Sequence, residues 1–255
     1  MSLLQLARKI TPQSLYPSSV LRRLVQRRTS LRVQAGPFQG MSYIERSVWG
    51  AYVPKLLGTY ELELHPFLEQ AIAAKPERLI DIGGAEGYYA VGLLLRLKQA
   101  KLLVFEQLPD ARSAIRQLAD RNAVADRLEI ANSCTPELLQ KAFEADVSTL
   151  VVCDVEGYER ELLDLEKVPG LARADILVEV HDAQVAGVSD LLKDRFAATH
   201  EVVRIDQAPR TISDYPFRDV AATVWPRAVL KYGLNEFRSP PNGWLWMKRR
   251  NSAQS

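Results

Sequence analysis

Short apolar segments that alternate with helix-length segments constrain the fold of this chain more than any other feature. The runs Leu150 to Val155 and Ile176 to Val180 are apolar on both faces, which is typical of strands buried inside a parallel sheet. From about residue 62 onward, segments of this kind take turns with segments long enough for helices. This alternation predicts an α/β domain in which helices cover both faces of a parallel sheet.

A single doubly wound domain is expected over residues 61–250. Asp110 is placed to cap the helix that starts near it, and Thr135-Pro136-Glu137 combines a capping residue, a proline at the first helical position and an acid in the first turn. The expected strands cover residues 78–82, 102–105, 128–131, 150–155, 176–180, 201–205 and 244–248, and the other expected helices cover residues 62–74, 86–98, 158–165 and 183–195.

The composition narrows the class of protein. Of the 255 residues, 47% are hydrophobic and 25% are charged, and no apolar run approaches the length of about 18 residues that a membrane span needs. Two cysteines, Cys134 and Cys153, are too few for a disulfide framework or a four-cysteine zinc site. The start of the sequence does not resemble a secretory signal. We therefore expect a cytoplasmic protein.

Residues 1–60 are expected to form a basic accessory segment with helical and hairpin parts. Such a segment could contact phosphates, an anionic membrane surface or an acidic partner, and it also fits an organellar transit peptide. We favour an amphipathic helix with Leu21, Leu24 and Val25 packed inward and the arginines in solvent. Before the first acid, Glu45, its basic residues are Arg8, Lys9, Arg22, Arg23, Arg27, Arg28 and Arg32.

A long irregular stretch over residues 206–242 interrupts the alternation. Stretches of this length are more often substrate loops or lids than connections. Arg210 and Arg238 could bind an anionic acceptor there, although arginines on a surface are commonly solvated. The aromatic residues of this stretch would form the lid or pack over the last strand: Tyr215, Phe217, Trp225, Tyr232 and Phe237.

A glycine turn follows the first expected strand, at the edge where open α/β sheets bind ligands. Its sequence is Asp81-Ile82-Gly83-Gly84-Ala85-Glu86-Gly87. Gly83 and Gly87 allow a tight turn and a close approach of backbone to a ligand, but their G-x-x-x-G spacing does not match the dinucleotide fingerprint G-x-G-x-x-G. Asp81 would repel a pyrophosphate and suits a cationic ligand, such as the ammonium of an amino acid.

The second expected strand ends in an acid, Glu106, which lies 23 residues after Gly83. A carboxylate at this place can accept hydrogen bonds from both ribose hydroxyls of an adenosine. The glycine turn and Glu106 together indicate an adenosine-containing ligand with a cationic end.

These residues resemble those of a known family. Asp81 to Gly87 is similar to the first motif of class I S-adenosylmethionine (SAM)-dependent methyltransferases, and Glu106 to their ribose-binding acid. The segment Cys153 to Leu163 resembles the D-x-E-G-x-E signature of the FkbM-like subgroup, as do Ile176 to His181 and Gly58 to Glu61. The resemblance implies a Rossmann-like methyltransferase domain with a seven-stranded, mostly parallel sheet that contains one antiparallel strand.

The resemblance also assigns roles to single residues around SAM. Asp81, Gly83, Gly84 and Gly87 would hold the methionine part, Glu106 the ribose, and Ser133, beside Asn132, the adenine. Asp154 would lie near the sulfonium, and the rings of Tyr60 and Tyr88 would line the pocket, because their faces attract a cation.

Methyl transfer to a hydroxyl requires that the hydroxyl lose its proton, either to a base or with the help of a metal ion. His181 follows a buried strand and suits the role of base, or it caps the strand end through a backbone hydrogen bond. Asp154 and Glu156 are two residues apart, as are Glu179 and His181, and alternate strand residues share a face. If the fourth and fifth strands are neighbours, these four side chains lie at the same edge of the sheet and would suit Mg²⁺ or Mn²⁺. Alternatively, Glu156 and Glu159 form salt bridges with Arg160 or cap the short helix that follows.

The leading hypothesis is a SAM-dependent O-methyltransferase that acts on a small molecule, a natural product or a glycan. A nicotinamide-dependent oxidoreductase is the alternative enzyme, and the missing G-x-G-x-x-G argues against it. A non-catalytic protein that binds nucleic acid or a membrane through the basic segment is the third hypothesis. Nucleic acid is not the expected acceptor, because no N-P-P-Y-like motif follows the fourth strand. The oligomeric state stays open.

Overall fold

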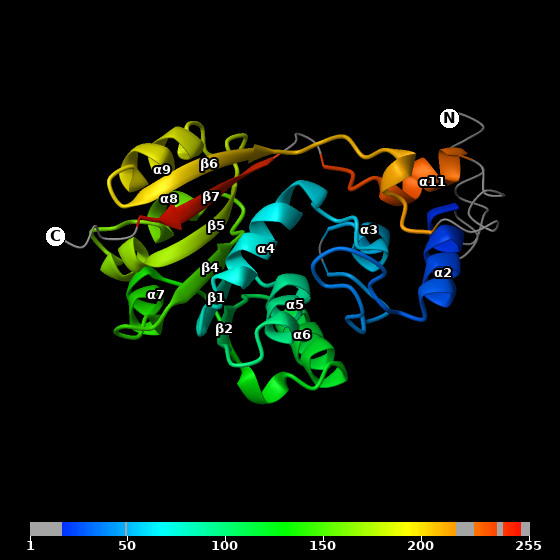
Figure 1. The fold of residues 1–255 in the computed structure, drawn as a ribbon, viewed down its shortest axis with the longest axis horizontal. Coiled ribbons are helices and arrows are strands. Elements are labelled where there is room, and N and C mark those ends of the chain that lie inside the picture. Colours follow the sequence, from blue (N-terminus) through cyan, green and yellow to red (C-terminus); the bar gives the residue numbers. More distant parts are fainter. Residues whose placement is uncertain (1–16, 49, 218–226, 239–241, 251–255) are drawn as a thin grey trace. The chain divides into compact units, whose positions relative to one another are not determined.

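The computed structural model describes residues 17–48, 50–217, 227–238 and 242–250 (Figure 1). Arg8, Lys9 and Trp225, which the sequence analysis singled out, lie outside these ranges. The chain forms two compact units, one from Met1–Tyr60 with Arg210–Glu236 and one from Glu61–Pro209 with Phe237–Ser255. We call them the small unit and the sheet unit.

A seven-stranded sheet organises the sheet unit, in the order β3-β2-β1-β4-β5-β7-β6. All neighbouring strands are parallel except that β7 runs antiparallel to both β5 and β6. This topology confirms the predicted Rossmann-like sheet with one antiparallel strand. The strands are β1 (Arg78–Ile82), β2 (Lys101–Phe105), β3 (Leu128–Ala131), β4 (Thr149–Cys153), β5 (Ala174–Val180), β6 (His200–Asp206) and β7 (Gly243–Arg249).

Most helices of the sheet unit begin near the predicted positions. Thr135 caps its helix as expected, because its hydroxyl accepts a hydrogen bond from the Leu138 N–H at 3.3 Å. The prediction for Asp110 is wrong, since Leu108 occupies the capping position and Asp110 lies in the first turn. The helices are α4 (His65–Ala73), α5 (Tyr88–Arg96), α6 (Pro109–Arg121), α7 (Pro136–Ala142), α8 (Glu159–Leu162) and α9 (Val188–Phe196), with short 3-10 turns at Leu62–Leu64, Ala125–Arg127 and Pro169–Arg173.

The helix expected over residues 183–195 starts later than predicted, at Val188. Gly187 before it has a positive φ of 74°, and the Asp182 carboxylate accepts a hydrogen bond from the Ser189 N–H at 3.0 Å. The side chain of Asp182 therefore orders residues 182–188 as a turn before the helix begins.

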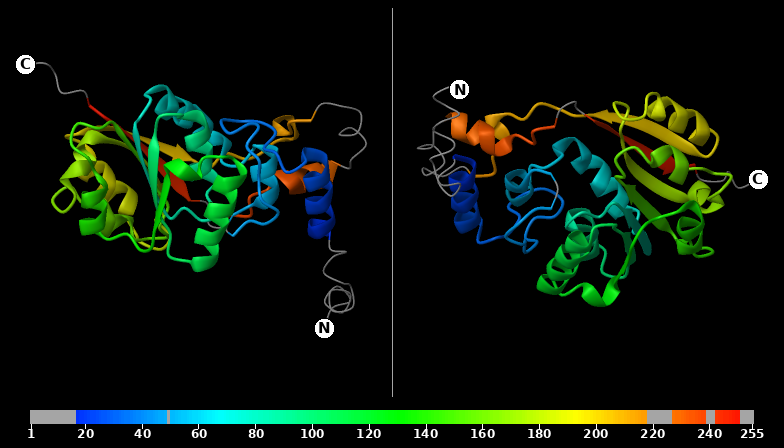
Figure 2. Two further views of the ribbon diagram at one scale, coloured as in Figure 1. Left: turned by 90° about the horizontal axis from the view of Figure 1, so that it is seen from below. Right: turned by 180° about the vertical axis from the view of Figure 1, so that it is seen from behind.

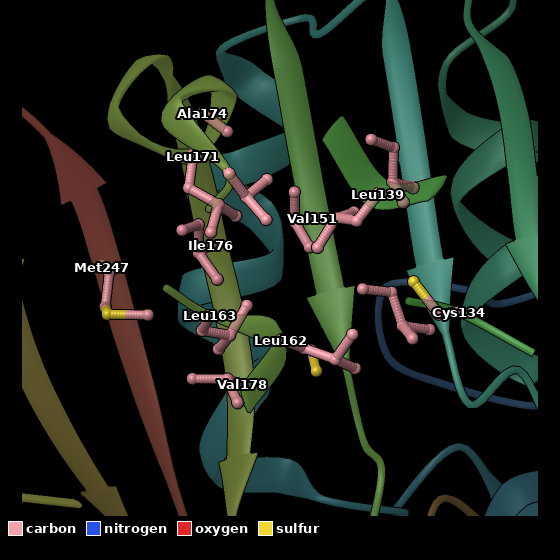
Figure 3. Close-up of a cluster of buried hydrophobic side chains, with 14 of the residues drawn as sticks. Cys134, Leu139, Val151, Leu162, Leu163, Leu171, Ala174, Ile176, Val178 and Met247 are labelled. Atoms are coloured by element: carbon pink, nitrogen blue, oxygen red, sulfur yellow. The ribbon is translucent and has the colours of Figure 1, made fainter. Parts of the chain in front are cut away.

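Helices cover both faces of the sheet, and Figure 2 shows the strands between two groups of helices. The face that carries Val151, Ile176 and Met247 packs against α7, α8 and α9 in one cluster of buried apolar residues (Figure 3). On the opposite face, Tyr89 of α5 lies against Trp244 of β7, with ring centroids 6.1 Å apart. Burial on both faces explains why most residues of the central strands are apolar.

The small unit contains α2 (Pro17–Thr29), α3 (Tyr52–Leu57), a 3-10 turn (Ile212–Asp214) and α11 (Arg227–Leu234). Leu21 and Val25 of α2 are buried as predicted, but Leu24 is 41% exposed. The prediction that the arginines of α2 lie in solvent is wrong for two of them. Arg22 lies over the ring of Tyr52 at 4.5 Å, and Arg28 lies over the ring of Phe217 at 4.1 Å, which are cation–π distances.

Residues 210–236 belong to the small unit, whereas the sequence placed them in the sheet domain. Arg210 and Glu236, the first and last residues of this segment, form a buried ion pair, with Nη2 2.5 Å from Oε1. Arg210 is therefore engaged by Glu236 and is not free for an acceptor. No helix in the described part of the chain is long and apolar enough to cross a membrane.

The packing of the buried cluster, part of which Figure 3 shows, predicts that a substitution within it lowers stability. Leu192 of α9 is 0% exposed, whereas Leu138 of α7 is 43% exposed. We expect Leu192→Ala to lower the free energy of unfolding by about 2–5 kcal/mol, because it leaves a cavity in a packed core. The control Leu138→Ala is expected to change it by no more than about 0.5 kcal/mol. Urea unfolding measures both, and equal effects would contradict this packing.

Candidate functional site

The turn after β1 and the end of β4 are in backbone contact. The Asp154 N–H donates a hydrogen bond to the Ile82 carbonyl at 2.8 Å. Gly83 has a φ of +86°, and a Cβ at this position would lie 1.8 Å from the Asp154 carbonyl oxygen. Only glycine fits here, so the backbone contact with Asp154 requires the glycine that the sequence places in this turn.

Two backbone N–H groups hold the side chain of Glu106, which directly follows β2. Its Oε2 accepts from the Ala85 N–H at 2.9 Å and its Oε1 accepts from the Leu108 N–H at 2.8 Å. Ala85 donates from a left-handed conformation, with φ +47°, which is uncommon for a residue with a Cβ. Each oxygen of a carboxylate has further acceptor capacity, so Glu106 is fixed in place and still able to accept a pair of hydroxyls.

Asp81 is a buried acid that lacks a complete set of partners. It is 4% exposed, and its Oδ2 has no hydrogen-bond partner among the described residues. Burial and the charge of Glu106 raise the pKa of Asp81 to about 7, against a backbone hydrogen bond from Ala90 that lowers it. Gly84 keeps the space beside this acid open, since a Cβ there would lie 3.5 Å from Asp81 Oδ2 and 2.8 Å from the side chain of Val104.

A second group of acids surrounds Arg238 near the ends of β4 and β5. The Arg238 guanidinium donates to Glu179 and to Glu61, and the Tyr89 hydroxyl donates to the other oxygen of Glu61. Burial, the charges of Glu179 and Glu61 and a hydrogen bond with Glu179 raise the pKa of Asp154 well above its usual range. The suggestion that Arg238 binds an anionic acceptor is therefore not supported, because two buried glutamates already neutralise it.

His181 follows β5 and is fully buried. Its Nδ1 lies 2.5 Å from Oε1 of Glu159, which is also fully buried. An ionised carboxylate can only accept, so Nδ1 carries a proton, and in the neutral imidazole Nε2 is left as an acceptor. Burial acts to lower the pKa of His181, but hydrogen bonding to Glu159 and the charges of Glu159, Glu179 and Glu156 outweigh it and raise the pKa.

The free Nε2 of His181 points at two carboxylates. It lies 3.6 Å from Asp154 Oδ1 and 3.4 Å from Glu156 Oε2. Each of these three residues offers one potential ligand atom, and the three atoms lie within 4.8 Å of one another. Glu179, predicted as a fourth member, is not in this group, and its Oε1 is bound by Arg238. The structure thus brings together three of the four residues proposed for a metal.

The reason for this convergence differs from the predicted one. Because β4 ends at Cys153, Asp154 and Glu156 are not alternate residues of a strand. Glu156 has a φ of +51° and Gly157 a φ of +106°, and this left-handed turn directs Glu156 back toward His181. Glu159 Oε1 also accepts from the Gly157 N–H, at 3.1 Å. All four named positions of the D-x-E-G-x-E segment therefore take part in one arrangement.

The remaining predicted positions are less informative. Gly87 has a φ of +92° and lies at the N-cap of α5, where Tyr88 is buried against Tyr89 with ring centroids 5.5 Å apart. Ser133 is exposed after β3. Tyr60 belongs to the small unit, where Lys55 Nζ lies 4.9 Å from its ring centroid. Contacts of these residues with a cofactor stay predictions.

Sequence reasoning misses two buried acids of the site. The sequence suggests that Glu159 forms a salt bridge or caps a helix, and it shows Glu61 only as part of a motif. The position of Glu159 two residues after Gly157 is a usable signal, because a side chain there can reach back to the N–H of the turn. The sequence contains no local signal for the pairing of Glu61 with Arg238, since 177 positions separate them.

Comparison with known proteins identifies structures with a similar fold but no matching sequence family. No family model and no curated protein match this sequence. The O-methyltransferase from Bacillus cereus in complex with SAH is similar in structure (TM-score 0.51, 12% identity, 96% of each chain covered). The O-methyltransferase TomG from Streptomyces achromogenes, in complex with SAM, has a TM-score of 0.50 at 13% identity, over 97% of this chain and 95% of its own.

A third structure, cofactor-bound Rv0187 from MTB, has a TM-score of 0.50 at 15% identity, and the match covers 98% of this chain and 97% of that one. Each of the three matches covers nearly the whole of both chains. They establish that the chain has the Rossmann-like fold of these structures.

The raised pKa of Asp81 generates a stability prediction. The pKa of Asp81 is about 7 in the folded protein, whereas the ordinary value for an aspartate is 3.8. As the pH rises from 3.8 to 7, the unfolded chain therefore loses this proton while the folded protein still holds it, and the free energy of unfolding falls. Each pKa unit is worth about 1.4 kcal/mol. We expect Asp81→Asn to raise the melting temperature of the ligand-free protein more at pH 8 than at pH 5.5.

The exposed Asp126 provides the control for this measurement. Asp126→Asn is expected to change the melting temperature little at either pH. A lower melting temperature of Asp81→Asn at pH 8 would mean that the fold stabilises the carboxylate of Asp81, which contradicts a raised pKa.

Proposed function

We propose that this protein is a SAM-dependent O-methyltransferase. The observation that carries the proposal is the pair of acids at the ends of β1 and β2. Asp81 is buried with an unsatisfied oxygen, and Glu106 is held by two backbone N–H groups. An unsatisfied carboxyl suits an ammonium, and a fixed carboxylate suits the two hydroxyls of a ribose. SAM carries both groups.

The glycine turn between these acids supports the same ligand. Gly83, Gly84 and Gly87 leave its backbone bare, and two of them have conformations that favour glycine. The solved O-methyltransferases with this fold were crystallised with SAM or SAH. Bound SAM would supply an activated methyl group, so the protein has to bind it, orient the acceptor and deal with the acceptor's proton.

The acceptor side of the proposed site is the group of Asp154, Glu156 and His181. A hydroxyl becomes a better nucleophile when its proton is removed. When no metal ion occupies Nε2, neutral His181 can take that proton there, and its pKa is raised by the surrounding acids, which strengthens it as a base. Asp154 and Glu156 belong to this group and Glu159 lies beside it, and these three acids disfavour an anionic acceptor. We therefore propose that the acceptor is a neutral small molecule or glycan.

The finer assignment to the FkbM-like subgroup is part of this proposal. Its support is the D-x-E-G-x-E segment, in which Asp154, Glu156, Gly157 and Glu159 all contribute to the arrangement around His181. The nicotinamide alternative is weaker, because Asp81 lies where a pyrophosphate would need a positive or neutral surrounding.

Calorimetric titration with S-adenosylhomocysteine tests the cofactor. We expect the wild type to bind it and Glu106→Gln to bind it roughly 10-fold to 100-fold more weakly, since hydrogen bonds to a charged group contribute about 1.5–3 kcal/mol. Glu129→Gln on β3 makes the same change at an exposed position and is expected to bind like the wild type. NAD⁺ serves as the control ligand.

Binding of NAD⁺ alone would replace the proposal by an oxidoreductase, and binding of neither ligand would overturn it.

The affinity for S-adenosylhomocysteine is also expected to depend on pH. The ammonium of the ligand needs the ionised form of Asp81, whose pKa is about 7, so the affinity should rise as pH increases from 5.5 to 8. In Asp81→Asn this rise should be absent and the affinity low throughout. The same titration at several pH values measures it, and an unchanged rise in the variant would assign the pH dependence to another group.

A further inference from the structure

We propose that Asp154, Glu156 and His181 form a binding site for a divalent cation of the Mn²⁺ and Mg²⁺ class. The site lies just beyond the ends of β4 and β5, and its ligand atoms are Asp154 Oδ1, Glu156 Oε2 and His181 Nε2. The proposal concerns the binding of an ion and stands whether or not the chain transfers methyl groups.

The distances between the ligand atoms fit an ion better than direct hydrogen bonds. Nε2 of His181 lies 3.4 Å and 3.6 Å from the two carboxylate oxygens, beyond the usual hydrogen-bond range of about 2.7–3.2 Å. Ligands about 2.1–2.2 Å from a shared ion are about 3.0–3.6 Å apart at octahedral or tetrahedral angles. The two distances from Nε2 therefore match the spacing of neighbouring corners of a coordination shell, and all three ligand atoms lie within 4.8 Å of one another.

Two of these atoms are buried without a hydrogen-bond partner among the described residues. They are His181 Nε2 and Asp154 Oδ1, and His181 as a whole is 0% exposed. A buried polar atom that is left unsatisfied loses its hydration without compensation, which destabilises the site. When His181 is neutral and Asp154 is ionised, both atoms are acceptors and cannot satisfy each other, and one cation between them would satisfy both.

Glu159 fixes the imidazole in the orientation that metal binding requires. It accepts the Nδ1–H of His181 at 2.5 Å, which leaves Nε2 as the free ligand atom. Metal-binding histidines commonly donate their other nitrogen to a carboxylate in this way. The same Oε1 holds the N–H of Gly157 at 3.1 Å, and Gly157 follows Glu156. One oxygen of Glu159 thus positions two of the three ligands, and we name Glu159 a positioning residue.

The set of ligands indicates the kind of ion. Two carboxylates and one imidazole suit Mn²⁺ and also Mg²⁺, whereas a dedicated zinc or copper site has more nitrogen or sulfur. The side chain of Glu156 is 73% exposed, so one side of the ion would remain open to water or to another ligand. Glu179 is engaged by Arg238 and does not complete the shell.

The competing explanation is a protonated His181 that pairs electrostatically with Asp154 and Glu156. Mn²⁺ distinguishes the two, because it displaces a proton from Nε2 only if the three groups can act as ligands. We would strip the full-length protein with EDTA and titrate it with Mn²⁺, following the electron paramagnetic resonance signal of the free ion. One Mn²⁺ per chain is expected, with nitrogen modulation from a coordinated imidazole in the pulsed spectrum.

Two glutamates near the start of α8 provide a matched pair of variants. Glu156→Gln removes a ligand at an exposed position and is expected to weaken Mn²⁺ binding at least 10-fold. Glu161→Gln makes the same change five residues later, outside the cluster, and should bind Mn²⁺ like the wild type. Glu159→Gln keeps an acceptor for Nδ1 but loses the charge, and it should weaken binding about 10-fold, with the imidazole signal reduced.

The proposal is overturned if the stripped wild type binds no Mn²⁺, if Glu156→Gln binds as tightly as the wild type, or if bound Mn²⁺ shows no nitrogen modulation. Thermal unfolding of each variant checks that it is folded. Titration of the same stripped samples with S-adenosylhomocysteine separates the two proposals, since the cofactor residues Asp81 and Glu106 are not ligands of the ion.

Discussion

The close approach of Gly83 to the Asp154 carbonyl is the constraint on which the candidate site depends. A side chain at Gly83 would collide with this carbonyl, so the turn after β1 can lie against the end of β4 only because it is bare. The contact sets two chemically different groups side by side in the sheet unit. One contains Asp81 and Glu106, held near the ends of β1 and β2, and the other is arranged around His181. A larger residue at position 83 would separate them before it altered any functional side chain.

Negative charge is the common property of both groups, and burial makes it costly. An acid removed from water must be protonated, hydrogen-bonded or paired with a cation. The structure uses each solution at a different place: the pKa of Asp81 is raised, backbone N–H groups hold Glu106, and Arg238 forms ion pairs with Glu61 and Glu179. The unsatisfied atoms that remain point to cationic ligands. This gives the two proposals one physical origin, although they concern different ions and different residues.

The sequence predicted the sheet well because buried strands leave a strong local pattern. It also predicted the positions of Asp81 and Glu106, since a residue that ends or follows a parallel strand must lie at the edge where ligands bind. It failed where the outcome depended on distant partners or on single dihedral angles. The convergence of Glu156 with His181 follows from a left-handed turn, not from strand periodicity. The exposure of Leu24 and the membership of residues 210–236 in the small unit depend on tertiary packing, which no window of sequence contains.

The pairing of β6 with β7 determines what residues 210–236 contribute to the topology. Asp206 lies opposite Gly243 in an antiparallel ladder, so the two strands would need only a short turn to form a hairpin. The chain instead leaves after Pro209 and returns at Phe237, and the ion pair between Arg210 and Glu236 joins the two ends of that excursion. In topological terms residues 210–236 are an insertion in a hairpin. Their length and sequence can therefore vary between related proteins without any change in the order of the strands.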